Sequence, residues 1–217
     1  MIRNNLFLIL LLILTTGFVN AQNDKTSQDI LKGLSDRYKS FNTVDADFTY
    51  VIESAQDKTN EKQKGKVYLK GAKYKLLIVG QEVYCDGSTV WTYLKDSKEV
   101  QITDPSTKAD AITPANIFNM YDKGFNSKFV DEKVEGGIAV QTIDLMPIDT
   151  KKKFFKIRLT VNKTEKQIIS SKIFDKNGNK ITYTIDTFHH DNPLDDSMFK
   201  FNIASYPGIE VIDLKDK

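Results

Sequence analysis

The sequence predicts a mainly β (α+β) fold, in which one large antiparallel sheet of about ten or eleven strands curls into a barrel or half-barrel. Three features of the 217 residues support this fold. Short runs of alternating apolar and polar residues recur along the chain, tight turns separate these runs, and only one long stretch has helical spacing. Because so few helices cannot form a layer of their own, we expect the N-terminal helix and one or two short helices to cover an opening or a face of the sheet.

The long helical stretch lies at residues 26–41, ahead of the strands. Its apolar face consists of Ile30, Leu31, Leu34, Tyr38 and Phe41. Thr26 is expected to cap this helix. A shorter helix is predicted at 113–121, where Thr113 can cap and Pro114 occupies the first helical position.

The predicted strands have one apolar face and one polar face. In "FFKIRLTV" (154–161), Phe155 and every second residue after it are apolar, whereas Lys156 and Arg158 alternate with them. The chain's only tryptophan, Trp91, shares a strand face with Tyr93 in the meander at 83–100. Hairpin turns are expected at 71–72, 86–87, 96–97 and 176–179.

The apolar residues of these strands are candidates for the inside of the curled sheet. They are Phe48, Tyr50, Ile52, Val67, Leu69, Tyr74, Leu76, Ile78, Trp91, Tyr93, Phe155, Ile157, Leu159, Ile181, Tyr183 and Ile185. Large aromatic and aliphatic side chains in such a place can fill a plain core or form the wall of a lipid-sized cavity. The pattern alone leaves both interpretations open.

The N-terminus predicts export. Residues 1–21 combine a positive start, an apolar run at 6–14 and a small-residue exit, which is typical of a cleaved signal peptide. An uncleaved anchor is the alternative, but the run is far shorter than the ~20 residues needed to span a bilayer. A lipid-anchored form would need cysteine at the first mature position, where this chain has Gln22. We therefore expect one mature domain, 22–217, free in the periplasm and monomeric.

Charge and cysteine content exclude several classes. Lys+Arg number 31 and Asp+Glu 29, and this balance gives no reason to expect nucleic acid as a partner. The lysines at 151–153 and at 58, 62, 64 and 66 are either solvated edge and turn residues or a docking patch. A single cysteine, Cys85, allows no internal disulfide and is expected to be buried and inert.

The sequence contains no recognisable catalytic set. It has no G-x-S-x-G, no H-E-x-x-H and no glycine-rich phosphate loop. The only histidines, His189 and His190, are adjacent in a strand, so they point to opposite faces and are poor joint ligands for one metal. We expect no enzyme activity, no cofactor and no metal.

Several segments together resemble the family of LolA, the periplasmic carrier of outer-membrane lipoproteins. The segments are "SFNTVDADFTY", "GKVYLKGAKYKL", "YCDGSTVWTY" and "FKFNIASYPGIEVIDL", in this order and over nearly the whole mature chain. The most specific element is D-G-x-x-x-W-x-Y, with Asp86, Gly87, Trp91 and Tyr93.

The resemblance implies a half-open barrel whose apolar cavity takes the acyl chains of triacylated lipoproteins. Cargo would arrive from an ATP-driven inner-membrane transporter and leave to an outer-membrane receptor or to the membrane. A lid containing Ile117, Phe118 and Tyr121 would compete for the cavity. The family's lid-binding arginine is replaced here by "LKGAKY", so Lys70 is the nearest basic candidate for that contact, and Tyr74 matches a family aromatic near the cavity mouth.

Two other functions remain open at this level. A periplasmic lipid- or lipoprotein-sensing regulatory module can be built on the same fold, although such regulators usually carry a second domain. A lipid-processing enzyme would need a nucleophile set that the sequence does not contain.

Overall fold

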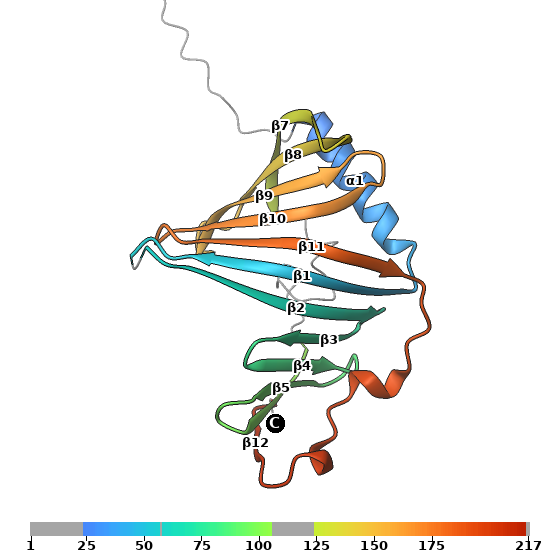
Figure 1. Ribbon diagram of the computed structural model, residues 1–217, viewed down its shortest axis with the longest axis vertical. Helices are drawn as coiled ribbons and strands as arrows, with labels where there is room; N and C mark the ends of the chain where they lie inside the picture. Colours follow the sequence, from blue (N-terminus) through green and yellow to red (C-terminus); the bar gives the residue numbers. More distant parts are fainter. Residues whose placement is uncertain (1–23, 57, 106–123, 216–217) are drawn as a thin grey trace, which may run out of the picture.

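A twelve-stranded sheet makes up most of the protein, and the computed structural model describes it over residues 24–56, 58–105 and 124–215. The strand order is β12-β6-β5-β4-β3-β2-β1-β11-β10-β9-β8-β7, so β12 and β7 form the two edges and the sheet does not close (Figure 1). The predicted half-open, mainly β architecture is confirmed. The described residues form twelve strands, where the sequence indicated about ten or eleven.

The elements follow one another mostly through tight turns. The strands are β1 (Thr43–Glu53), β2 (Asn60–Lys70), β3 (Lys73–Ile78), β4 (Gln81–Cys85), β5 (Val90–Leu94), β6 (Glu99–Thr103), β7 (Phe125–Glu135), β8 (Ile138–Pro147), β9 (Phe154–Asn162), β10 (Gln167–Asp175), β11 (Lys180–His190) and β12 (Glu210–Asp213). The helical elements are α1 (Lys25–Lys39) and the short 3-10 helices η2 (Asp196–Phe199) and η3 (Ile203–Ser205). The predicted signal peptide and the helix at 113–121, with its lid residues, lie outside the described part of the chain.

One strand departs from the expected antiparallel pattern. β12 pairs with β6 in parallel, with Glu210 opposite Glu99 and Asp213 opposite Ile102. Parallel partners need a long connection, and the chain supplies one because residues 191–209 run from β11, in the middle of the sheet, to the edge next to β6.

The pairing register divides the sheet into two faces. Residues directly opposite each other on paired strands share a face, and every second residue of a strand does so too. Phe48 of β1 lies opposite both Gly65 of β2 and Ile185 of β11, and Val67 of β2 lies opposite Leu76 of β3. We call the face that contains these residues the inner face, because α1 packs against it.

Helix α1 closes one end of the inner face. Leu31, Leu34 and Tyr38 are buried in the main hydrophobic cluster, and the Tyr38 hydroxyl accepts a hydrogen bond of 3.1 Å from the Ile168 N–H. Burial raises the pKa of Tyr38 to about 12, so its hydroxyl stays protonated. In Figure 1 the helix runs across the ends of β7–β11 and leaves the opposite strand ends free of it.

The start of α1 differs from the sequence prediction. Asp24, not Thr26, is the cap, and its carboxylate accepts a hydrogen bond of 2.7 Å from the Ser27 N–H. The same carboxylate accepts the Phe129 N–H of β7. Because one aspartate serves both the helix and the edge strand, the start of the helix is fixed by a contact between segments distant in sequence.

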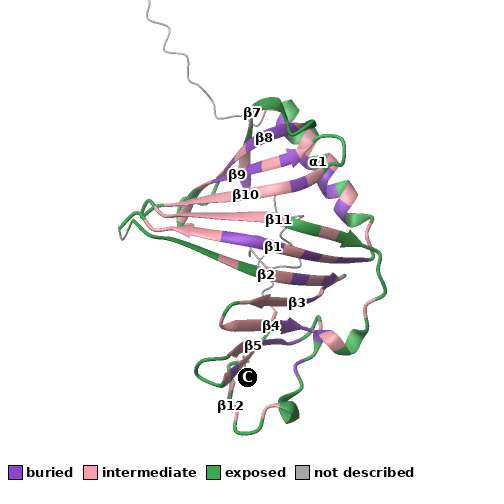
Figure 2. Ribbon diagram, in the orientation of Figure 1, coloured by how far each residue is buried: buried purple, intermediate pink, exposed green. Residues whose placement is uncertain are grey.

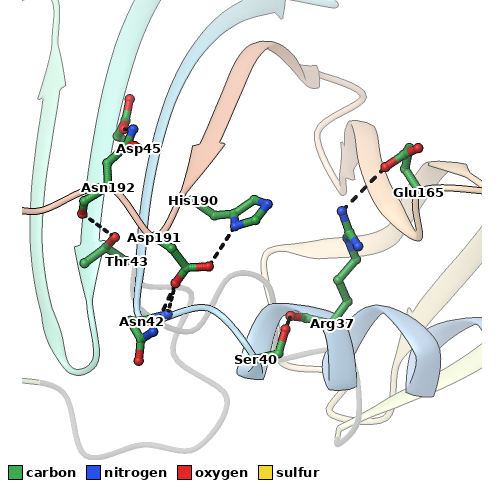
Figure 3. Close-up of polar contacts among 9 residues, drawn as sticks. All are labelled: Arg37, Ser40, Asn42, Thr43, Asp45, Glu165, His190, Asp191 and Asn192. Carbon is green, nitrogen blue, oxygen red and sulfur yellow. Dashed lines mark hydrogen bonds and ion pairs between the residues drawn. The ribbon is translucent and has the colours of Figure 1, made fainter.

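The junction between α1, β1 and β11 holds the helix end in place (Figure 3). The Asp191 carboxylate accepts a hydrogen bond of 2.8 Å from the Asn42 N–H, and it lies 2.8 Å from His190 Nδ1. The hydrogen bond from the Asn42 N–H contributes most to lowering the pKa of Asp191, and the contact with His190 lowers it further. The His190 ring stacks on Phe41 with 4.1 Å between ring centroids. The junction is therefore a structural clamp on the strand that follows the helix.

Substituting Gly65 by alanine should destabilise the sheet. A Cβ at Gly65 would lie 2.3 Å from the Phe48 ring, which covers this glycine across the β1–β2 pair. Overpacking of this kind costs about 1–3 kcal/mol in the free energy of unfolding. The measurement is urea unfolding of Gly65→Ala in the wild type and in a Phe48→Leu background, whose shorter side chain leaves room. An equal cost in both backgrounds would refute the proposed ring contact as the cause.

Candidate functional site

The inner face changes from buried to half-exposed along its strands. At the α1 end, Val44 and Ala46 of β1 and Val161 of β9 are buried. At the opposite end, Ile52 of β1 and Ile181 of β11 are only half-buried, and Figure 2 shows this graded burial. The helix therefore seals one end of the apolar face, whereas the described residues leave the other end partly open.

We call the partly open part of this face the inner band. It consists of Ile52, Leu76, Ile78, Ile173, Ile181, Tyr183 and Ile185, all half-buried. All except Ile181 pack against the main hydrophobic cluster. Ile181 lies between Ile52 and Ile173 in the strand pairing, which puts it on the same face.

The inner band is electrically neutral. Its only titratable group is the Tyr183 hydroxyl, whose pKa is raised by burial. The neighbouring Tyr50 ring stacks on Tyr183 with 5.9 Å between centroids, and its pKa is also raised by burial. Both tyrosines are therefore neutral at physiological pH. An uncharged, aliphatic and aromatic surface of this kind favours hydrocarbon and disfavours charged ligands.

Most charges of these strands and of the neighbouring β8 and β9 lie on the other face, whereas Glu61 of β2 is exposed on the inner face opposite Ile52. Asp144 of β8 accepts two hydrogen bonds from Arg158 of β9, at 2.7 and 2.8 Å. Burial raises the pKa of Asp144, but the hydrogen bonds and the positive charge of Arg158 outweigh this effect, so the pKa is lower than usual. Glu53 lies 2.8 Å from Lys172. In β9, Ile157, Leu159 and Val161 are buried in the main hydrophobic cluster, and Arg158 lies on the other face.

The structure brings most of the sequence-predicted interior residues together on the inner face. They are Phe48, Tyr50, Ile52, Val67, Leu69, Tyr74, Leu76, Ile78, Ile157, Leu159, Ile181, Tyr183 and Ile185. Tyr74 is buried, and this burial raises its pKa to about 12. Three of the predicted residues lie elsewhere.

Phe155 does not face inward, so this prediction is wrong. The register of β9 against β10 shifts here, because Lys156 lies opposite Phe174 whereas Phe154 lies opposite Asp175. This β-bulge turns Phe155 outward, where it is 50% exposed and its ring centroid lies 6.2 Å from that of Phe174. Phe154 takes the inward position instead and packs against the main cluster.

Trp91 and Tyr93 lie on the outer face, so their predicted place among the interior residues is also wrong. Pairing puts Trp91 opposite Tyr84, which neighbours the inward-facing Cys85 and therefore points outward. Trp91 belongs to a second cluster with Tyr84, Val100 and Phe201. The chain's one tryptophan therefore anchors the returning C-terminal segment against the outside of the meander.

No sequence signal indicated the C-terminal residues that cover Trp91 and Tyr93. Phe201 is buried, and its ring centroid lies 5.5 Å from that of Tyr93 and 4.7 Å from that of Tyr206. We call residues 192–215 the C-terminal clasp. Ile173 was also missed, because a register shift after Ile168 breaks the alternation of β10.

Lys70 binds the clasp. Its Nζ donates a hydrogen bond of 2.8 Å to the Leu194 carbonyl and lies 2.7 Å from the Asp196 carboxylate. Lys73 Nζ contacts the other Asp196 oxygen at 2.6 Å. The predicted contact between Lys70 and a lid involves residues outside the described part of the chain.

The stability that Asp196 contributes should depend on pH in acid only. The Lys70 and Lys73 side chains lower the pKa of Asp196 from 3.8 to about 2. A carboxylate with a lowered folded-state pKa stabilises the protein above its unfolded pKa and loses this effect as the pH falls through the folded value. Urea unfolding should therefore show a difference between wild type and Asp196→Asn that is constant above about pH 5 and shrinks progressively as the pH falls to about 2 and below. A difference that persists unchanged at pH 2 would contradict the assignment.

Cys85 is buried as expected, and burial raises the pKa of its thiol. Within residues 24–56, 58–105 and 124–215, no group of three or more His, Cys, Asp or Glu side chains is arranged to hold a metal ion. In the same ranges no helix is long and apolar enough to cross a membrane.

Known structures share this fold at low sequence identity. An uncharacterized conserved protein from Thermus thermophilus is 12% identical, with a TM-score of 0.59 over 87% of this chain and 99% of that chain. A DUF1329 family protein from Desulfovibrio piger is 14% identical, with a TM-score of 0.51 over 85% of this chain and 99% of that one. A LolA superfamily protein from Nitrosomonas europaea is 12% identical, with a TM-score of 0.44 over 81% and 97%. At this identity the Thermus thermophilus and Desulfovibrio piger structures show the fold alone.

The family itself is identified from sequence. A search of curated proteins gave no significant match. The family model described as outer membrane lipoprotein carrier protein LolA matches residues 39–202, which is well over half of the chain. These residues include every strand from β1 to β11 and the start of the clasp. The chain therefore belongs to the LolA family.

Proposed function

We propose that the protein is a soluble periplasmic carrier that holds the acyl chains of triacylated lipoproteins against its inner face. The observation that carries this proposal is the inner band, an uncharged and half-buried apolar surface that extends over the inner face from β3 to β10. A plain core would be expected to be sealed at both ends of the strands. Here burial falls off on several strands towards the same end.

The physical chemistry of the cargo supports a carrier. Each methylene group costs about 0.8 kcal/mol to leave in water, and a triacylated protein carries about forty or more of them. Diffusion of such a protein through the periplasm therefore needs a binding surface for the chains. That surface must be apolar and free of charge, because a carboxylate or ammonium group buried without a partner costs several kcal/mol.

The direction of transport that we propose is based on membership of the LolA family. Cargo would come from an ATP-driven inner-membrane transporter and pass to an outer-membrane receptor or to the membrane itself. We propose no catalytic step and no cofactor, because hydrocarbon burial and release need neither. The leader at 1–21 would be removed on export, which leaves a mature protein that begins at Gln22.

The test is mass spectrometry of the protein purified from its native periplasm under non-denaturing conditions. We expect an adduct with the mass of a triacylated lipoprotein, and we expect a fluorescent fatty-acid probe to bind the stripped protein and be displaced by that cargo. Protein that carries no adduct and binds no acyl probe would refute the carrier role. Binding of a periplasmic domain of a membrane protein, without any acyl binding, would instead favour a sensing module.

A further inference from the structure

Three turns meet at the end of the sheet that α1 does not cover. They are the β1–β2, β8–β9 and β10–β11 turns, and hydrogen bonds join them. The Ala55 N–H donates to Asn179 Oδ1 at 3.0 Å, and the Lys176 N–H donates to the Lys153 carbonyl at 3.0 Å. The Lys176 ammonium group also donates to the Thr150 carbonyl. We call residues 53–64, 148–156 and 172–180 together the hairpin rim.

The hairpin rim concentrates positive charge. It contains ten lysines and five carboxylates, so its net charge is +5, whereas the whole chain carries +2 and the rest is therefore net negative. The lysines are residues 58, 62, 64, 151, 152, 153, 156, 172, 176 and 180. Lys58, Lys62, Lys64, Lys151 and Lys153 are exposed. The rim is thus basic in a protein that is otherwise slightly acidic.

The same rim also exposes large apolar side chains. Phe155 is 50% exposed, and Ile148 is 61% exposed beside the three consecutive lysines. The bulge that turns Phe155 outward pairs its ring with Phe174, and Lys156 Nζ lies 4.4 Å from the centre of the Phe174 ring. Exposed aromatic and aliphatic residues surrounded by lysines are typical of surfaces that lie at a membrane interface.

We propose that the hairpin rim docks the protein onto an anionic lipid bilayer. Lysines attract a negatively charged membrane surface, and Phe155 and Ile148 can enter the headgroup region between them. The rim lies at the strand ends where the inner-band residues Ile52 and Ile181 are directly adjacent in sequence to the rim residues Glu53 and Lys180. Docking would therefore bring the half-exposed end of the apolar face to the membrane. The inference does not depend on what the inner face binds.

The test is flotation of cargo-free protein with vesicles in low salt. We expect the wild type to bind vesicles of phosphatidylcholine with phosphatidylglycerol and not those of phosphatidylcholine alone, and ~0.5 M salt to weaken binding. The triple substitution Lys151→Gln, Lys152→Gln and Lys153→Gln should lower the partition onto anionic vesicles by more than about tenfold. Phe155→Ser should lower it several-fold while leaving the circular dichroism unchanged.

A matched variant separates position from net charge. Lys25→Gln, Lys128→Gln and Lys200→Gln remove the same charge from exposed lysines outside the rim, and this triple variant should partition like the wild type. Equal loss in both triple variants would mean that only net charge matters, and it would overturn the docking surface. Failure of the wild type to bind any vesicle would overturn it too, whether or not acyl probes bind the inner face.

Discussion

The substitution Leu76→Asp is expected to reduce acyl-probe binding by at least about a hundredfold. Leu76 belongs to the inner band, and a carboxylate there would have to be desolvated beside bound hydrocarbon, which costs roughly 3 kcal/mol or more. Because Leu76 is only half-buried in the free protein, the aspartate can stay hydrated when no ligand is bound. The measurement is a fluorescence titration with a fatty-acid probe.

The neighbouring residue gives a matched control. Leu77 is the same residue type, on the same strand and also half-buried, but it lies opposite Glu82 and Lys66 and therefore faces outward. Leu77→Asp should bind the probe like the wild type, and urea unfolding should show similar stability losses for both variants. Equal loss of binding in the two would mean that the inner face is not the binding surface.

The substitution Phe201→Ala is expected to detach the C-terminal clasp. Phe201 is buried against Tyr84, Tyr93 and Tyr206, and removing a buried phenylalanine side chain costs about 3–5 kcal/mol. Trp91 is the chain's only tryptophan and lies in the same cluster, so its emission reports on the clasp directly. We expect a red shift of this emission under native conditions, before the sheet unfolds.

A core substitution elsewhere should behave differently. Leu159→Ala removes a fully buried side chain from the main cluster, where it is remote in the strand order from the Trp91 strand. This variant should lower the unfolding midpoint by a similar amount without shifting the native emission. If Phe201→Ala leaves the emission unchanged, the clasp does not cover Trp91 in solution.

The sequence was sufficient for the alternation of faces. In β11, Ile181, Tyr183 and Ile185 alternate with polar residues, and a strand has no freedom to point neighbouring side chains to the same side. The same alternation failed at Phe155, because a bulge inserts one extra residue and nothing in "KKKFFKI" marks which phenylalanine it displaces. Which phenylalanine turns outward depends on how β9 pairs with β10, where the Phe155 ring contacts that of Phe174. This pairing is set by the tertiary structure.

The predicted role of Trp91 failed for a different reason. The alternation of Trp91 and Tyr93 was interpreted correctly, but both faces of the meander are apolar and the sequence does not say which one faces α1. That choice depends on the clasp, whose Phe201 lies more than a hundred residues away along the chain. When both faces of a strand are apolar, its inward face can be assigned only when the segments that pack on each face are known.

The sequence by itself determined the strands, the turns and the apolar character of one face, because these depend on residue type and on spacing along a few residues. The tertiary structure alone decided which apolar residues are sealed by α1 and which remain half-exposed. It also brought three lysine-rich turns together, although they lie far apart in the sequence. Burial and charge concentration depend on the distances between segments in space, and local sequence patterns contain no such distances.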